Sequence, residues 1–342
     1  MSAGPWKPIR LEVYQSRIEE LHFPVTVSDD LKSATIDYTI TLESVPRNGT
    51  VRVDLYDPQE SQITDKSVVY SETLPVDSTT IKGRITIKPP KLWYPVGYGL
   101  QSLYKVVVEL QKDNSILDSK NQKLGIRRAH VIQNPLKDEG GTTFYFEINN
   151  IPIFCGGSNW IPADNILTRL TPQRYREWLH LLVKGNQNMV RVWAGGIYEH
   201  DSFYEAADEL GILVWQDFLF GCGQYPAHTA FQKNVKREAI TQMKRLRHHP
   251  SIVLLAGNNE DYQVAEQAPL DWDPSDTNPD NWLKTNFPAR YIYEKLLPEV
   301  TLKHAPGIFY HPGSPWGGGK PTTDKTVGDL HQWNGISNEI LN

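Results

Sequence analysis

The residues best suited to acid–base chemistry stand at the end of an apolar segment, where Gly257-Asn258-Asn259-Glu260 follows Ile252-Val253-Leu254-Leu255. A carboxyl group at the end of a buried strand is partly desolvated, which favours the protonated form that a general acid needs. Asn258 or Asn259 beside it would bind a substrate hydroxyl without adding charge. The alternative is that Glu260 caps the following helix, and the local sequence leaves both interpretations open.

A possible charge pair lies on two earlier apolar segments. Asp217 follows Val214-Trp215-Gln216 and could accept two sugar hydroxyls. Arg191 stands between Val190 and Val192, where an unpaired charge is costly. Arg191 would therefore either keep a catalytic carboxylate ionised or form a structural ion pair with Asp217.

Polar and aromatic residues follow the other apolar segments and complete the candidate site. Asn159 and Asp164 come after the first of these segments, and His331 lies near the carboxyl end of the chain. Tryptophan rings offer flat faces to sugars but more often fill cores, so we expect about two of four candidates to face a ligand. These four are Trp160, Trp193, Trp215 and Trp333.

Neither a cofactor nor a metal ion is expected. Gly317-Gly318-Gly319-Lys320 resembles a phosphate-binding loop, but Ser314 and Pro321 break the required spacing. His248-His249 lies at a predicted helix end, and no third ligand accompanies His311 and His331. The two cysteines exclude a disulfide scaffold and a cysteine-based zinc cluster.

Composition excludes several classes of protein. The 342 residues carry a net charge of −5, and no long Lys/Arg block suggests a nucleic-acid partner. No uninterrupted apolar stretch approaches the roughly 18 residues of a membrane span. No basic segment followed by an apolar one marks a signal peptide, so we expect an intracellular, cytoplasmic protein.

The elements that must position these residues change character along the chain. Residues 21–125 alternate apolar and polar side chains in about seven short runs, which predicts an immunoglobulin-like β-sandwich. Residues 9–18 also alternate like a strand, which either joins the following domain or belongs to a domain that is missing upstream. From about Thr143 onward, short apolar strands alternate with amphipathic helices.

The β/α pattern favours a barrel over a doubly wound sheet. Polar residues follow the predicted strands, as in (β/α)8 barrels, and the glycine pattern of a dinucleotide fold is absent. Five strands are clear, at 153–155, 189–193, 212–215, 252–255 and 308–310, with a possible sixth near 329–331. Helices are expected from Thr171-Pro172 to Gly185, from Asp201 to Gly211, over 231–246 and over 289–303. Eight strands close a barrel, so residues 126–342 are expected to form an incomplete (β/α)8 TIM barrel.

Four segments carry a family resemblance, namely 157–164, 188–199, 209–218 and 249–260. Together they resemble glycoside hydrolase family 2, and within it the β-mannosidases of the intracellular fungal B type. The resemblance runs from Ala3 to about Asn334, and it implies that residues 1–20 are a remnant of the family's amino-terminal sugar-binding β-sandwich. It implies a retaining exo-glycosidase that removes terminal β-D-mannose from β-mannoside oligosaccharides, in polysaccharide or N-glycan degradation.

The resemblance also implies roles for particular residues. Glu260 matches the acid/base, and the matching substrate-binding residues are Asn259, Asp217, Trp193, Asn159, Asp164, His331 and Trp333. The family's nucleophile is a later glutamate in a Ser-Glu-Phe-Gly context, which this sequence lacks. The glutamates after the acid/base are Glu266, Glu294, Glu299 and Glu339.

The missing nucleophile leaves two interpretations open. The chain is expected to be truncated at both ends, and to be either part of a β-mannosidase or an inactive fragment that binds sugar weakly. A homodimer is a further expectation for the full-length enzyme.

Overall fold

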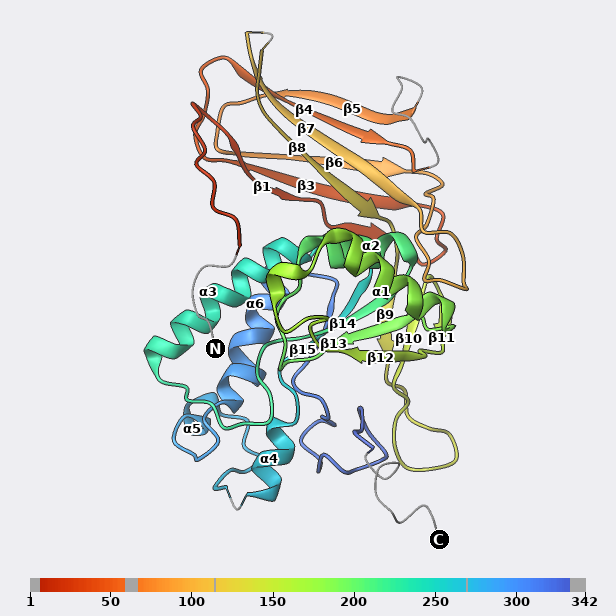
Figure 1. The fold of residues 1–342 in the computed structure, drawn as a ribbon, viewed down its shortest axis with the longest axis vertical. Helices are drawn as coiled ribbons and strands as arrows, with labels where there is room; N and C mark the ends of the chain where they lie inside the picture. The colour runs from red at the N-terminus through yellow and green to blue at the C-terminus, as the bar shows by residue number, and fades with distance from the viewer. Residues whose placement is uncertain (1–6, 59–66, 114, 269, 333–342) are drawn as a thin grey trace.

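The computed structural model describes residues 7–58, 67–113, 115–268 and 270–332. An antiparallel β-sandwich comes first along the chain, and a parallel sheet with helices follows it (Figure 1). A small antiparallel sheet connects the two parts.

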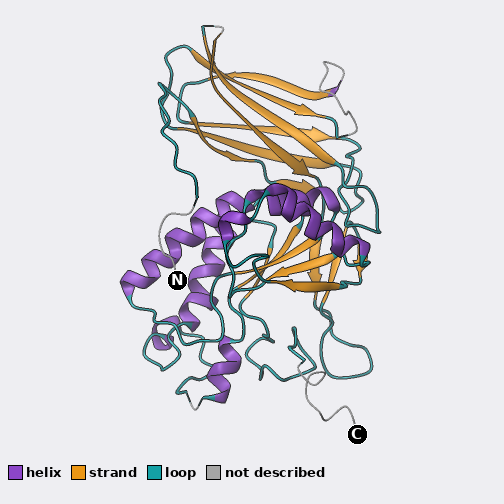
Figure 2. Ribbon diagram, viewed as in Figure 1, coloured by secondary structure: helices purple, strands orange, loops and turns teal. Residues whose placement is uncertain are grey.

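The sandwich is built from two four-stranded sheets that face each other (Figure 2). One sheet contains β1 (Ile18–His22), β2 (Val25–Val27), β3 (Ala34–Leu42) and β6 (Thr80–Ile87); the other contains β4 (Gly49–Tyr56), β5 (Val68–Pro75), β7 (Leu103–Lys112) and β8 (Ser115–Gly125). Alternate residues of β3 and β7 point into a core that includes Ile36, Ile40, Val106 and Val108, all fully buried. The period-two pattern of the sequence therefore corresponds to one buried face on each sheet.

The predicted strand over residues 9–18 is wrong. The first strand begins only at Ile18, and Ile9, Leu11 and Val13 are 88–91% exposed. A strand needs a partner strand for its backbone groups, and no strand of the described ranges pairs with residues 9–16.

A three-stranded antiparallel sheet lies between the two larger parts. It consists of β9 (Ala129–Ile132), β10 (Tyr145–Ile148) and β11 (Ile151–Ile153). The segment 153–155 was expected to be the first parallel strand, and this is wrong: Ile153 ends β11 and pairs with Phe146 in the antiparallel β10–β11 hairpin. The first parallel strand starts four residues later, at Gly157.

Five parallel strands form one sheet in chain order: β12 (Gly157–Trp160), β13 (Met189–Val192), β14 (Leu213–Asp217), β15 (Ile252–Ala256) and β16 (Phe309–His311). Every residue of β15 is buried, as expected for a strand covered on both faces. The prediction of a possible sixth strand near 329–331 is wrong, since the described residues 329–332 form a loop.

The helices between these strands begin and end near the predicted signals. α1 (Pro172–Lys184) starts after Thr171, whose side chain accepts the Arg174 N–H, and α2 (Asp201–Leu210) ends at Gly211 with φ of 75°. α3 (Thr229–Leu246), α4 (Asp261–Gln267) and α5 (Pro279–Trp282) follow. The helix expected over 289–303 contains a π-helical turn, Ile292–Leu296, that leads into α6 (Leu297–His304). None of the helices in the described ranges is long and apolar enough to cross a membrane.

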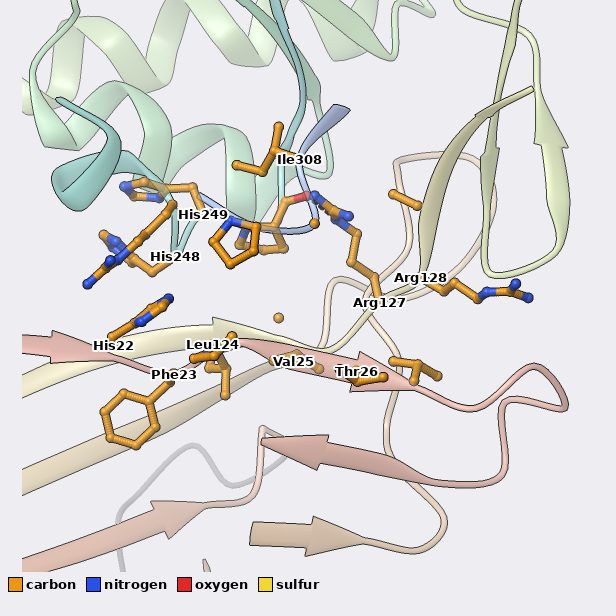
Figure 3. Close-up of a pocket in the computed structure, with 18 of the residues that line it drawn as sticks. His22, Phe23, Val25, Thr26, Leu124, Arg127, Arg128, His248, His249 and Ile308 are labelled. Carbon is orange, nitrogen blue, oxygen red and sulfur yellow. Dashed lines mark hydrogen bonds between the residues drawn. The ribbon is translucent and has the colours of Figure 1, made fainter. Parts of the chain in front are cut away.

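The sandwich contacts the β/α part around a cavity of about 370 Å³. Figure 3 shows His22 and Phe23 of the sandwich on one side of it and His248 and His249, which follow α3, on the other. Arg127 joins the two parts, because its guanidinium donates to the carbonyl oxygens of Pro250 and Ile252 at 2.6 Å each.

Candidate active site

A cavity of about 570 Å³ lies where the parallel strands end. Its lining comes from residues at or just beyond the carboxyl ends of β12, β13 and β15, and from two loops. The lining residues are Asn159, Ile161, Arg191, Trp193, Cys222, Asn259, Glu260, Leu330, His331 and Gln332. Ligands of parallel β/α folds bind at this edge of the sheet.

The Glu260 side chain points into this cavity and does not cap α4. Glu260 occupies the N-cap position with a left-handed backbone (φ of 64°), but its carboxylate makes no capping hydrogen bond. Its Oε1 lies 2.6 Å from His331 Nδ1, and its Oε2 lies 3.6 Å from the Cys222 thiol. A non-glycine residue in this conformation costs of order 1 kcal/mol or more, and such strain is common in active sites.

Arg191 joins the polar residues beneath the cavity. Its Nη2 donates to Asp217 Oδ2 and to Asn259 Oδ1, both at 2.8 Å. Its Nη1 lies 3.5 Å from Asn159 Oδ1 and from His331 Nε2. The guanidinium therefore holds residues from four segments of the chain in one arrangement.

Asp217 is fully buried and is absent from the cavity lining. Its carboxylate accepts hydrogen bonds from Arg191, the Trp215 indole and the Ala194 N–H. Burial raises the pKa of Asp217 to about 6, and the charge of Arg191 opposes that rise. Asp217 was interpreted either as an acceptor of sugar hydroxyls or as the ion-pair partner of Arg191. The structure shows the ion pair with Arg191.

Among the described tryptophans, only Trp193 lines the cavity. Trp160 is a core residue, 6% exposed, whose indole donates to Glu199, and the Trp215 indole donates to Asp217. Asn159 lines the cavity, whereas Asp164 accepts the Ile166 N–H in a local turn. Trp333 lies outside the described residues.

Sequence reasoning missed two groups of residues near Glu260. Cys222 touches the carboxylate and accepts a hydrogen bond from Asn259 at 3.2 Å, but no motif surrounds it. Ser314 and Asp329 connect His311 to His331 through hydrogen bonds. They lie in the segment after β16, and only its folding back onto the site brings them there.

Within the described ranges, Glu260 is the one carboxylate in the lining of this cavity. Glu266 accepts hydrogen bonds from Thr322, Glu294 pairs with Arg290, and Glu299 pairs with Lys295. Glu339 lies outside the described residues. The described part of the chain also contains no group of three or more side chains suited to hold a metal ion.

Comparisons with known proteins show which proteins this chain is similar to. Residues 16–127 match the model of the family described as "Glycosyl hydrolases family 2". The chain is 51% identical over 334 residues to "Beta-mannosidase B" of Aspergillus fumigatus and 49% identical over 336 residues to that of Thermothelomyces thermophilus. The crystal structure of a β-D-mannosidase from Dictyoglomus thermophilum is similar, with a TM-score of 0.78 and 36% identity over 93% of this chain.

The matches to the two fungal proteins and to the bacterial structure cover nearly all of the chain but a smaller part of each relative. The alignments cover 98% of this chain and 39% and 38% of the two fungal proteins, and 37% of the bacterial structure. The chain therefore spans about two fifths of the length of these relatives.

Proposed function

We propose that this chain is part of a family 2 glycosyl hydrolase and that it carries the acid/base part of a retaining exo-β-mannosidase active site, from the match of residues 16–127 and the similarity to fungal β-mannosidases B. The substrate is a terminal β-D-mannose residue of a β-mannoside oligosaccharide. Within this proposal, residues 126–342 are the first part of a (β/α)8 barrel and 21–125 an immunoglobulin-like domain.

The observation that carries the proposal is the position of Glu260. The carboxylate lies at the carboxyl end of β15, in a cavity that also presents the Trp193 ring. An acid/base must reach the glycosidic oxygen, and an aromatic ring can bind the apolar face of a sugar. Asn159 and Asn259 supply amide groups for the sugar hydroxyls, and Arg191 positions both amides.

The reaction needs a second carboxylate. A retaining glycosidase places its nucleophile about 5–5.5 Å from the acid/base, where it forms the glycosyl-enzyme that water then hydrolyses. No other carboxylate among the described residues lines the cavity. The second candidate function, weak sugar binding without turnover, rests on this observation and concerns the 342-residue chain by itself.

A chimera tests the role of Glu260 directly. In it, this chain replaces the segment of the Aspergillus fumigatus protein with which it aligns. We expect the chimera to cleave both an aryl β-mannoside and a β-mannosyl disaccharide, and the chain by itself to cleave neither. An inactive chimera that is correctly folded would contradict the proposal.

The variant Glu260→Gln in the chimera separates acid catalysis from other roles. General acid catalysis contributes about 10²–10⁴-fold. We expect kcat on the disaccharide to fall by about that factor, with a smaller loss for glycosyl-enzyme formation from an activated aryl mannoside, whose leaving group needs no proton. Glu266→Gln, on the same helix, is the matched control. Equal losses on both substrates would exclude the acid role.

Three finer features are part of the proposal. They are a role in polysaccharide or N-glycan degradation, an intracellular location and a homodimer of the full-length enzyme. Their support is the similarity to fungal β-mannosidases B.

A further inference from the structure

Five side chains form a hydrogen-bonded chain that ends on Glu260. His311 Nε2 lies 2.7 Å from Asp329 Oδ1, and Asp329 Oδ2 lies 2.7 Å from Ser314 Oγ. Ser314 Oγ lies 2.9 Å from His331 Nε2, and His331 Nδ1 lies 2.6 Å from Glu260 Oε1. A hydroxyl has one proton and a neutral imidazole has one N–H, so the direction of each bond constrains the next.

The chain starts from an ionised carboxylate. Burial raises the pKa of Asp329, but hydrogen bonds from His311, Ser314 and the Trp316 N–H outweigh that effect and hold the pKa below its usual value. An ionised carboxylate has no proton to donate. The Ser314 hydroxyl must therefore donate to Asp329.

The direction of the Ser314 bond then sets the tautomer of His331. With its only proton directed at Asp329, Ser314 Oγ can only accept from His331 Nε2, which must carry a hydrogen. In a neutral imidazole protonated at Nε2, the other nitrogen has a lone pair. That nitrogen, Nδ1, faces Glu260 at 2.6 Å, so in this neutral form of His331 the carboxyl group of Glu260 must be the donor.

Two neighbours bear on this arrangement. The Ser314 backbone is bonded to the residues around Glu260, since Ser314 N–H donates to Asn258 and the Ser314 carbonyl accepts from the Glu260 N–H, both at 2.9 Å. The Arg191 guanidinium lies 3.5 Å from His331 Nε2. The Ser314 backbone bonds therefore keep its hydroxyl beside His331 and Glu260.

We propose that Ser314 and Asp329 are positioning residues that hold His331 in its Nε2–H tautomer, so that Glu260 and His331 share one proton and Glu260 rests as the protonated acid. This inference depends on the proposed acid role of Glu260 only for its consequence in catalysis. In the first step Glu260 gives its proton to the leaving oxygen as the glycosidic bond breaks. In the second step the attacking water returns a proton to Glu260, and His331 undergoes no net change.

The test is the tautomer of His331, measured by ¹⁵N NMR on the 342-residue chain labelled at its histidines, in solution or as a sediment. His331→Gln identifies the signal among the ten histidines. At neutral pH we expect a protonated Nε2 and an unprotonated Nδ1. A protonated Nδ1 with an unprotonated Nε2, or protonation of both nitrogens, would overturn the proposal without any variant.

Ser314→Ala tests the cause of the tautomer. Without the hydroxyl, Nε2–H loses its acceptor, while Nδ1–H can donate to an ionised Glu260. We expect the Nε2–H to Nδ1–H ratio to fall by about tenfold or more, as loss of a buried hydrogen bond implies. Ser158→Ala, which removes a hydroxyl bonded to Gln187, should leave the ratio unchanged. An unchanged ratio in folded Ser314→Ala would overturn the proposal.

The readout separates this inference from the proposed function. The tautomer is measured without substrate, so a chimera that cleaves no mannoside leaves the NMR result standing. In an active chimera, Ser314→Ala should also slow the disaccharide more than the aryl mannoside, because Glu260 would rest ionised.

Discussion

At the residue scale, the candidate site depends on one arginine and one glycine. Arg191 touches Asp217 and Asn259 and so connects a buried carboxylate to the cavity lining. Gly195 packs against the Trp193 ring, where a Cβ atom would lie 1.9 Å from Cζ3. The position of the only described tryptophan in the lining thus depends on the absence of a side chain two residues away.

Gly195→Ala should displace the Trp193 ring and weaken mannoside binding. An aromatic contact is worth about 0.5–1.5 kcal/mol, and 1.4 kcal/mol is a tenfold change in affinity. We expect the dissociation constant of a mannose-configured inhibitor, measured on the chimera by calorimetry, to rise up to about tenfold. Gly156→Ala is the control, because its Cβ would meet nothing closer than 3.9 Å. Unchanged affinity would show that Trp193 is not a sugar platform.

At the scale of elements, short junctions dock the β/α units against the sandwich. Gly211 ends α2 in a left-handed conformation, and its carbonyl accepts the Val96 N–H at 2.8 Å. A Cβ at Gly211 would lie 2.6 Å from Val96 N, whereas one at Gly307, also left-handed with φ of 88°, would meet nothing within 4 Å. The two glycines thus share a conformation and differ in their surroundings.

This contrast predicts unequal losses of stability. Gly307→Ala should lower the free energy of unfolding by about 1 kcal/mol, the cost of a left-handed backbone alone. Gly211→Ala should lower it by about 3 kcal/mol, because it adds a steric clash at the docking contact. Urea unfolding of both variants gives the comparison. Equal losses would mean that the α2 end contributes nothing to docking.

At the scale of the whole molecule, the contact between the sandwich and the β/α part is rich in basic groups. Glu20 of β1 pairs with Lys244 and Arg247 of the α3 end. Burial is the largest of the effects that lower the pKa of His22 to about 4. The positive charges of Arg247, His304 and Lys244 also lower this pKa, and the charge of Glu20 opposes them. Protonation of His22 therefore opposes the docking of the two parts.

The stability of the chain should fall on acidification, in part through His22. The pKa of His22 is lowered on folding, so its contribution is present above about pH 6.5 and is lost as the pH falls through about 4. After allowance for solvent screening, we expect the free energy of unfolding of His22→Gln to fall by about 1–2 kcal/mol less than that of the wild type over that range. Thermal melts from pH 7 to 4 measure it, with the exposed His180→Gln as control. Parallel curves for wild type and His22→Gln would contradict this assignment.

Local signals in the sequence determined most of the element boundaries. Thr171 and Gly211 act within one turn of the backbone, so their positions alone predict where α1 begins and where α2 ends. The alternation in β3 and β7 likewise requires only a buried face on one side. The pair Asn259 and Glu260 was predicted at a strand end because β15 is apolar throughout.

Only the tertiary structure decided which residues meet and which interpretation of each residue applies. Asp217 forms the ion pair, and Glu260 leaves its helix uncapped, because partners distant in the chain approach them. Residues 9–17 alternate like a strand but are not one, since pairing depends on a partner strand and not on the pattern. Ser314 and Asp329 carry no motif, and their place beside His331 follows from the folding of the segment after β16, which no local physical signal encodes.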